Sequence, residues 1–252
     1  MLNIALNTFK EIVRNRFLYL IVFFAFVFIV FSISLGQLTI WESEKVVVDF
    51  GIAMIEVFGL IGVLFVGSQL LFKEVEGKTI FLILSKPIAR KDFILGKYLG
   101  FSWVIFLLFL MQTGVFFWVL LVQSIEINLL IVISLLFTLF KLLILLAIVF
   151  FLSSFMSPIL TIIVSLMIFI ISHSFSLLLT MFWNMSDTLL FVVQLIQLLF
   201  PPLEALNTKD VIGTFEILPP LYTITNFLYS VLYVTVILYF TVLIFWCKNF
   251  EE

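Results

Sequence analysis

Six long apolar stretches dominate this sequence and restrict what it can fold into. They cover residues 17–35, 52–72, 101–122, 129–152, 159–182 and 221–247. Roughly 20 apolar residues in helical form cross a hydrocarbon core about 30 Å thick. Because backbone groups inside a bilayer must be hydrogen-bonded within the protein, such stretches cross as helices. We therefore expect an all-α polytopic membrane protein with six transmembrane helices, forming one domain over residues 1–252.

The composition disfavours the main soluble alternatives. Apolar residues make up 64% of the chain and charged residues 11%, whereas soluble proteins average about 45–50% and about 25%. A net charge of −2 provides no basic field for nucleic acid, so we expect no nucleic-acid partner. One cysteine and one histidine cannot supply an intrachain disulfide or a typical tetrahedral zinc site.

The basic residues predict which side of the membrane each connection faces. Residues 1–16 carry three lysines and arginines, residues 73–100 carry six, and the tail carries Lys248, whereas the opposite connections carry only Lys45 and Lys209. Cytoplasmic loops of membrane proteins are enriched in such residues. Both termini and residues 73–100 should therefore be cytoplasmic, and residues 183–220 should face outward.

Two shorter helical segments are expected beside the spans. Residues 1–16 have an apolar stripe with helical spacing, formed by Leu2, Ala5, Leu6, Phe9, Ile12 and Val13. Such a helix should lie flat at the cytoplasmic interface, either as a topology anchor or as an elbow helix that transmits movement. Thr188 to Phe200 is a 13-residue apolar run between Ser186-Asp187 and Pro201-Pro202. It is too short to cross and should be re-entrant or interfacial.

No catalytic motif is found. The chain contains no H-E-x-x-H, G-x-S-x-G or C-x-x-C pattern. Gly77-Lys78-Thr79 looks like the end of a phosphate-binding loop, but Phe72 stands where that loop needs its earlier glycine. We therefore predict no catalytic residues, no metal and no cofactor in this chain.

Three polar residues inside the apolar stretches are candidates for function: Glu56, Lys141 and His173. A charge at the depth of Lys141 costs at least about 2.5–3.5 kcal/mol on insertion scales, so its side chain should face the bundle, a dimer interface or a wet pathway. Glu56 is the predicted partner; a neutral lysine bonded to hydroxyls such as that of Thr138, or a cargo contact, are the alternatives. His173 is interpreted as a hydrogen-bonded packing residue, because no carboxylate lies within a helical turn of it.

Residues 73–100 are the most informative cytoplasmic segment. They contain a short apolar helical candidate, Thr79 to Ser85, and a second helix from about Arg90 into the third span, separated by a turn at Lys86-Pro87. Charged residues flank the ridge formed by Ile80, Phe81 and Leu84. Such a ridge suits docking into a groove on a soluble partner, or lying among lipid headgroups.

Several patterns in the chain resemble type-2 ABC permeases, the exporter-type membrane subunits of ATP-binding-cassette transporters. The first cytoplasmic connection of that family is similar to Glu74-Val-Glu76-Gly-Lys78-Thr79, Leu84-Ser85-Lys86-Pro87-Ile88-x-Arg90 and Gly96-Lys97-Tyr98-Leu99-Gly100. Thr8-Phe9-x-Glu11-x-x-Arg14-Asn15-Arg16 resembles the elbow helix, and Ser153 to Pro158 the second cytoplasmic turn. Phe200 to Asn207 resembles an outer loop of the branch related to the nitrous-oxide-reductase maturation permease.

The resemblance implies a non-catalytic permease in a bacterial plasma membrane, with an outer helical hairpin before the sixth span. It would pair with a second permease, the same chain or a related one, and with two copies of a separate ATPase that holds ATP-Mg. The residues implied in coupling to that ATPase are Glu74, Glu76, Thr79, Ile80, Phe81, Leu84, Ser85, Pro87 and Arg90. The same helices would contact membrane lipid.

Two other functions remain open from the sequence. An ion-driven secondary carrier could use Lys141 and Glu56 as coupling residues, although the inverted repeats and paired broken helices typical of carriers are not found. A membrane scaffold or assembly factor could recruit a partner through residues 73–100 without transporting anything.

Overall fold

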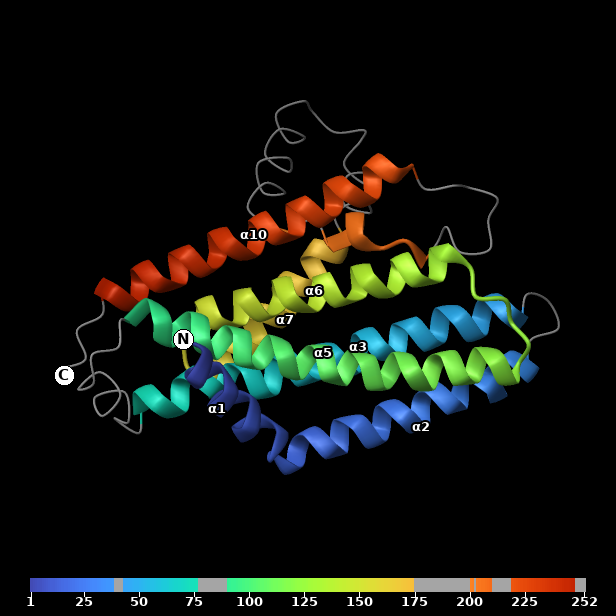
Figure 1. The fold of residues 1–252 in the computed structure, drawn as a ribbon, viewed down its shortest axis with the longest axis horizontal. Helices are drawn as coiled ribbons and strands as arrows, with labels where there is room; N and C mark the ends of the chain where they lie inside the picture. Colours follow the sequence, from blue (N-terminus) through green and yellow to red (C-terminus); the bar gives the residue numbers. More distant parts are fainter. Residues whose placement is uncertain (39–42, 77–89, 175–199, 202, 210–218, 248–252) are drawn as a thin grey trace.

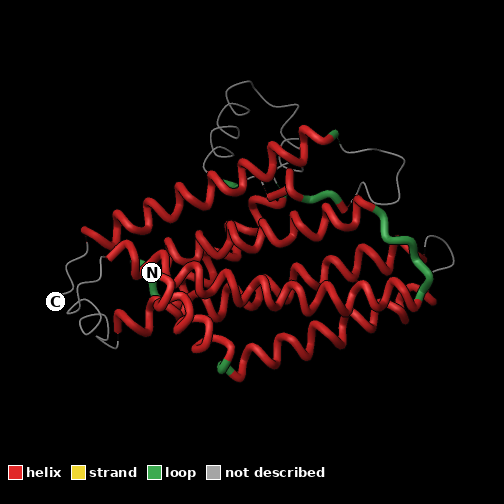
Figure 2. Tube along the Cα trace, in the orientation of Figure 1, coloured by secondary structure: helices red, strands yellow, loops and turns green. Residues whose placement is uncertain are grey.

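The chain folds into an elongated bundle of helices, drawn in Figure 1. The computed structural model describes residues 1–38, 43–76, 90–174, 200–201, 203–209 and 219–247. Within these residues the secondary structure is helical, with short turns and loops and no strand (Figure 2). The prediction of an all-α chain is therefore confirmed for the part of the chain that the structure describes.

The helices follow the apolar stretches in order. They are α1 (Leu2–Val13), α2 (Arg16–Leu38), α3 (Ser43–Glu76), α5 (Arg90–Val122), α6 (Leu129–Ser153), α7 (Pro158–His173), the short 3-10 helix η1 (Leu203–Leu206) and α10 (Pro220–Cys247). Five of them, α2, α3, α5, α6 and α10, are long and apolar enough to cross a membrane. α7 covers only the first part of the fifth expected span, residues 159–182, whose remainder lies outside the described residues, as does the expected helix over 188–199.

Both α3 and α5 begin before the apolar residues of their spans. α3 begins at Ser43 rather than at the predicted Ile52, whereas α5 begins at Arg90, as predicted for the helix that runs into the third span. A hydropathy boundary marks where apolar residues start, but a helix satisfies its own backbone and can continue through charged residues beyond the hydrocarbon. Glu44 and Lys45 are such residues in the first turns of α3.

α6 is the central helix of the bundle. It packs against α3, α5, α7 and α10, and most of its length is buried. A close approach to α3 occurs at Gly59, where an added Cβ would lie only 2.4 Å from Cδ1 of Leu142. Because Gly59 has no side chain, Leu142 of α6 fits against α3 at this point and the two helices approach closely.

α1 packs across the first turns of α5. Its residues Ala5, Thr8 and Ile12 are buried, and a Cβ added at Gly100 would lie 2.5 Å from the carbonyl oxygen of Ala5. The predicted amino-terminal helix is therefore present, with its apolar stripe partly turned toward α5. Its location at a membrane interface remains a prediction.

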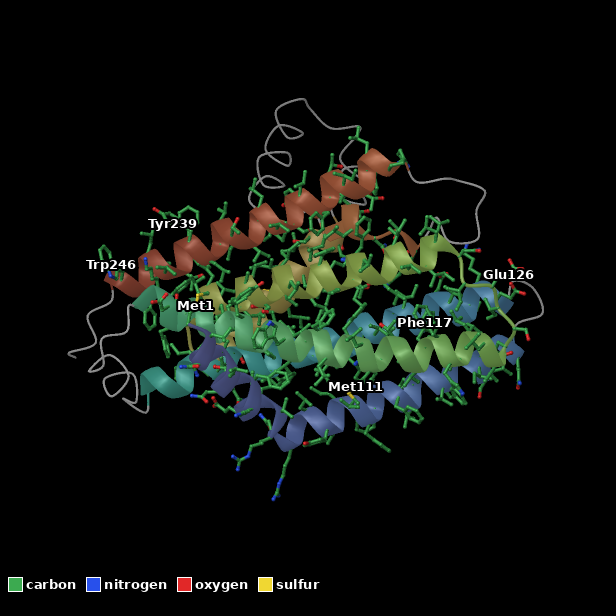
Figure 3. The ribbon with its side chains drawn as sticks, viewed as in Figure 1. Met1, Met111, Phe117, Glu126, Tyr239 and Trp246 are labelled. Carbon is green, nitrogen blue, oxygen red and sulfur yellow. The ribbon has the colours of Figure 1, made fainter. Side chains whose placement is uncertain are left out.

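The outer faces of the bundle are apolar as well. Large apolar side chains are exposed along α2 and α10; on α10 Tyr239 and Trp246 project away from the bundle (Figure 3). Contiguous exposed apolar surface of this extent is unusual for a soluble monomer. It fits helices whose outward faces contact lipid.

The two ends of the bundle collect different segments. The end of α3, the start of α5 and the carboxyl end of α10 lie at one end, beside α1 (Figure 1). The end of α2, the start of α3 and the loop from α5 to α6 lie at the other. This arrangement brings together the segments that the basic residues assign to one side of the membrane.

Candidate functional site

Three charged side chains from separate parts of the chain meet inside the bundle. Glu56 comes from α3, Lys141 from α6, and Lys209 from the residues that follow η1. The Nζ atom of Lys141 donates to Oε1 of Glu56 at 3.0 Å, and Lys209 donates to Oε2 of the same carboxylate. The predicted pairing of Lys141 with Glu56 is therefore confirmed.

These charges are removed from the surface to different degrees. The side chain of Lys141 is 1% exposed, that of Glu56 is 6% exposed and that of Lys209 is 18% exposed. Burying an ion is costly, and its attraction to a partner offsets that cost only where the hydrogen bonding is good. Each oxygen of Glu56 has its own ammonium donor, which meets this condition.

Local packing explains why the two helical partners meet. Gly59 lies three residues after Glu56 and Leu142 directly follows Lys141, so the close contact of α3 with α6 lies beside the ion pair. Thr138, one turn before Lys141, donates its hydroxyl to the carbonyl oxygen of Ser134 at 2.9 Å. The contact of Lys141 with a carboxylate favours the charged pair over a neutral lysine bonded to hydroxyls.

His173, at the end of α7, lies beside the same carboxylate. Its Nε2 atom is 4.0 Å from Oε1 of Glu56, beyond hydrogen-bond distance. The Nδ1 atom is buried without a hydrogen-bond partner among the described residues, and the ring packs against Phe169 with centroids 5.2 Å apart. The packing role is thus present, whereas the predicted hydrogen bond is not found in this part of the chain.

Lys209 is the one residue of this buried charge cluster (Glu56, Lys141 and Lys209) that sequence reasoning missed. The charge pattern indicates only that it is one of two basic residues in the outward connections. Leu203 and Leu206 of η1 are buried against residues of α6, and they hold the following residues against the bundle. The signal available in the sequence was a Leu-x-x-Leu pair that ends three residues before an isolated lysine.

The residues implied in ATPase coupling are only partly described. Glu74 and Glu76 belong to the last turns of α3, and Arg90 begins α5. Thr79, Ile80, Phe81, Leu84, Ser85 and Pro87 lie outside the described residues. α3 ends and α5 begins at the end of the bundle where α1 packs (Figure 1).

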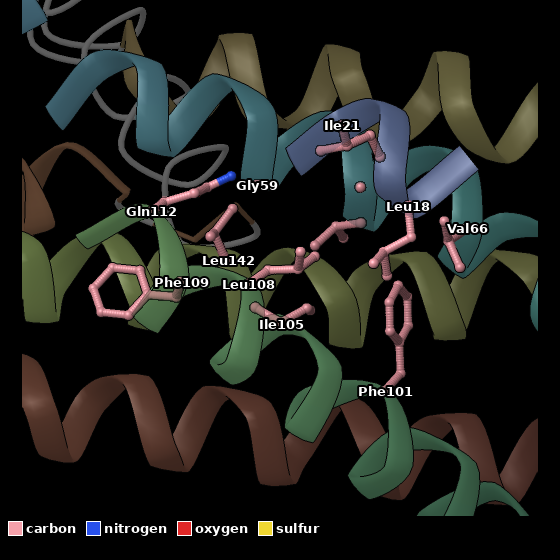
Figure 4. Close-up of a pocket in the computed structure, with 12 residues that line it drawn as sticks. Leu18, Ile21, Gly59, Val66, Phe101, Ile105, Leu108, Phe109, Gln112 and Leu142 are labelled. Atoms are coloured by element: carbon pink, nitrogen blue, oxygen red, sulfur yellow. The ribbon is translucent and has the colours of Figure 1, made fainter. Parts of the chain in front are cut away.

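The cavity between α2, α3, α5 and α6 does not offer a cargo site. It has a volume of about 10 Å³, enough for about one water molecule. Its apolar lining, including Leu18, Ile21, Phe101, Ile105, Leu108 and Leu142, is drawn with Gln112 in Figure 4. Among the described residues no three His, Cys, Asp or Glu side chains group in a way that could hold a metal.

The apolar helices and the lipid-facing surface define an integral membrane protein. Comparison with known proteins identifies its class: the model of the ABC-2 family transporter proteins matches residues 2–248, so the chain belongs to that family. No curated protein matches the chain. Members of this family are permease subunits of ABC transporters; they are not themselves catalytic and normally work with an ABC ATPase subunit.

Proposed function

We propose that this chain is one half of an exporter, in which two permeases span a bacterial plasma membrane and a separate pair of ATPases supplies the energy. The observation that carries the proposal is the family match over nearly the whole chain. The export direction rests on the resemblance of residues 74–100 to exporter-type permeases. ATP-Mg would be held entirely by the partner ATPase, and this chain would supply movement rather than chemistry.

Residues 77–89 are the proposed contact with the ATPase. They connect α3 to α5, so a force applied to them passes directly into two long helices. α3 continues without a break from Glu76 back to Glu56, a distance of 20 residues, or about 30 Å of helix. Movement at the ATPase would thus reach the buried charges through one rigid element.

The proposed mechanism is a rigid-body transition. Closure of the ATPase dimer on ATP would push residues 77–89, and the bundles would rock between inward-facing and outward-facing states. The cargo would pass between the two permeases.

The ATPase contact can be tested by co-purification. Phe81→Ser with Leu84→Ser should release the ATPase from the solubilised complex while leaving this chain inserted in the membrane. Leu2→Ser with Leu6→Ser is the matched control, because both leucines are exposed on α1 and lie outside the proposed contact. Undiminished co-purification of the first variant would favour contact of this ridge with lipid headgroups instead.

The orientation can be tested by labelling single cysteines introduced at Lys91 and Glu126 after Cys247→Ser removes the natural one. Both positions are exposed, at the start of α5 and in the loop between α5 and α6. An impermeant thiol reagent added to intact cells should label position 126 and not position 91. The opposite pattern would contradict cytoplasmic termini.

A further inference from the structure

The 3-10 helix η1 and the three residues after it connect two parts of the bundle. We call residues 203–209 the η1 segment; they contact α10 on one side and α3 and α6 on the other. On the α10 side, the Tyr222 hydroxyl and the Asn226 amide both donate to the carbonyl oxygen of Ala205, the latter at 3.3 Å. The η1 segment is thereby attached to the first turns of α10.

A second set of contacts attaches the same segment to α3 and α6. Lys209 donates to Glu56 on α3, and the hydroxyls of Thr208 and Ser134 on α6 are 2.6 Å apart. Both hydroxyls are buried. Two adjacent residues of the η1 segment therefore reach two different helices.

The two ion pairs of Glu56 are not equivalent. Lys141 is almost fully enclosed, whereas Lys209 is 18% exposed and lies in a short connecting segment. If Lys209 moved away, water could solvate its ammonium group, and Glu56 would keep Lys141. The remaining pair would be neutral overall, so no uncompensated charge would be left in the interior.

We propose that the Glu56–Lys209 ion pair and the Ser134–Thr208 hydrogen bond form a latch. This latch closes the end of the bundle at which α6 and α10 begin. Release of the latch lets the η1 segment separate from α3 and α6, while α10 keeps its own packing against α6 and the Glu56–Lys141 pair holds α3 and α6 to each other. This inference rests on the proposed function, because the transport cycle would supply the force. That force would arrive along α3, which carries Glu56.

The latch can be measured first without any ATPase. Thr208→Cys places a thiol at a buried position in a chain whose own cysteine is removed by Cys247→Ser. This change replaces the hydroxyl that bonds to Ser134 and keeps the Glu56–Lys209 pair, so the labelling rate reports the ion-pair half of the latch. Both membrane faces are accessible in lipid nanodiscs, so the labelling rate reports local opening and not orientation. Adding Lys209→Gln should speed labelling roughly tenfold, because a sheltered ion pair contributes about that factor to a local opening equilibrium.

Three matched variants separate the latch from general loosening. Lys45→Gln removes the other basic residue of the outward connections and should leave the labelling rate unchanged. Lys141→Met should slow labelling, because release of Lys209 would then leave Glu56 without a counter-charge in the interior. Tyr222→Phe weakens the attachment to α10 only and should have little effect. An unchanged rate in Lys209→Gln, or an equal increase in Lys45→Gln, would overturn the latch.

The second experiment tests whether the transport cycle opens the latch. In the complex with the ATPase, ATP with vanadate should speed labelling at position 208, and a disulfide between Ser134→Cys and Thr208→Cys should stop turnover until a reductant is added. Turnover unaffected by the disulfide would overturn the gating role. Failure of any ATPase to co-purify would contradict the proposed function. It would not contradict the latch, because the labelling in nanodiscs does not depend on that partner.

Discussion

Among the described residues two lysines are almost completely buried, and they are held in different ways. Lys141 on α6 donates to Glu56 at 3.0 Å, and the carboxylate is itself 6% exposed. Lys97 on α5 is 4% exposed, but its ammonium lies 3.8 Å from Glu11, whose side chain is 61% exposed. The first charge is enclosed together with its partner, whereas the second reaches toward a carboxylate in contact with the surroundings.

The difference follows from what covers each lysine. α1 crosses the first turns of α5 and covers Lys97, and the Lys97 ammonium lies 5.7 Å from the centre of the Phe93 ring. A long side chain can bury its aliphatic part and still place its charge near a polar boundary. Lys141 lies halfway along α6 and has no such boundary near it. Burial alone therefore does not show how much a lysine depends on its carboxylate.

The largest effect is expected from Glu56→Leu. This change leaves Lys141 without its enclosed carboxylate, and breaking a buried pair costs about 3–5 kcal/mol. The measurement is thermal unfolding of the purified protein in detergent. Glu56→Leu combined with Lys141→Leu should be more stable than Glu56→Leu alone, and Glu44→Leu, at an exposed position of the same helix, is the control. If Glu56→Leu and the control unfold at the same temperature, Lys141 does not depend on its enclosed carboxylate and the two lysines do not differ in this respect.

The next effect concerns the α1 contact that covers Lys97. Gly100→Ala places a Cβ 2.5 Å from the Ala5 carbonyl oxygen, so α1 must move away from α5. Overpacking of this kind costs about 1–3 kcal/mol. Gly114→Ala on the same helix is the control, because nothing lies within 4 Å of the added atom. If both variants melt at the same temperature, α1 does not hold α5 as described.

Lys141→Leu should cost less than Glu56→Leu. Glu56 keeps Lys209 in this variant, so the carboxylate still has an ammonium donor. We expect a folded protein with a loss on the order of 1 kcal/mol, since only one of two ion pairs is removed. Comparison of its unfolding temperature with those of Glu56→Leu and the double variant gives the coupling between the two residues. A loss as large as that of Glu56→Leu would mean that Lys209 does not support the carboxylate.

The smallest effect is expected from Glu11→Gln. An exposed carboxylate 3.8 Å from an ammonium contributes little, typically under about 1 kcal/mol, and salt screens it. The unfolding temperature should therefore shift only slightly at low salt, and still less at high salt. A loss as large as that of Glu56→Leu, and equally large at high and low salt, would show that Lys97 depends on Glu11 as Lys141 depends on Glu56.

Sequence reasoning recovered the long helices of the described residues and one contact between them. The Glu56–Lys141 pair was predictable because a charge inside a long apolar run needs compensation, and few opposite charges occur in the other runs. Lys97 was counted as a cytoplasmic charge, and neither its burial nor its contact with Glu11 was foreseen. Its cover comes from α1, and the sequence does not state which face of α5 another helix will occupy.

α6 and α10 show most clearly where the sequence stops being informative. Both are long apolar helices, but α6 is packed on several sides whereas α10 exposes most of its length. In a membrane the lipid-facing and protein-facing sides of a helix can be equally apolar, so hydropathy does not separate them.

The sequence by itself determined that the chain is helical, which stretches are long enough to cross a membrane, and that Lys141 must be compensated. These properties depend on local composition and on the cost of placing polar groups in hydrocarbon. Only the tertiary structure decided that α6 is central, that α1 covers Lys97, and that Lys209 shares Glu56 with Lys141. Those features depend on side-chain volume and close approach, as at Gly59 and Gly100, where a missing side chain lets two helices meet.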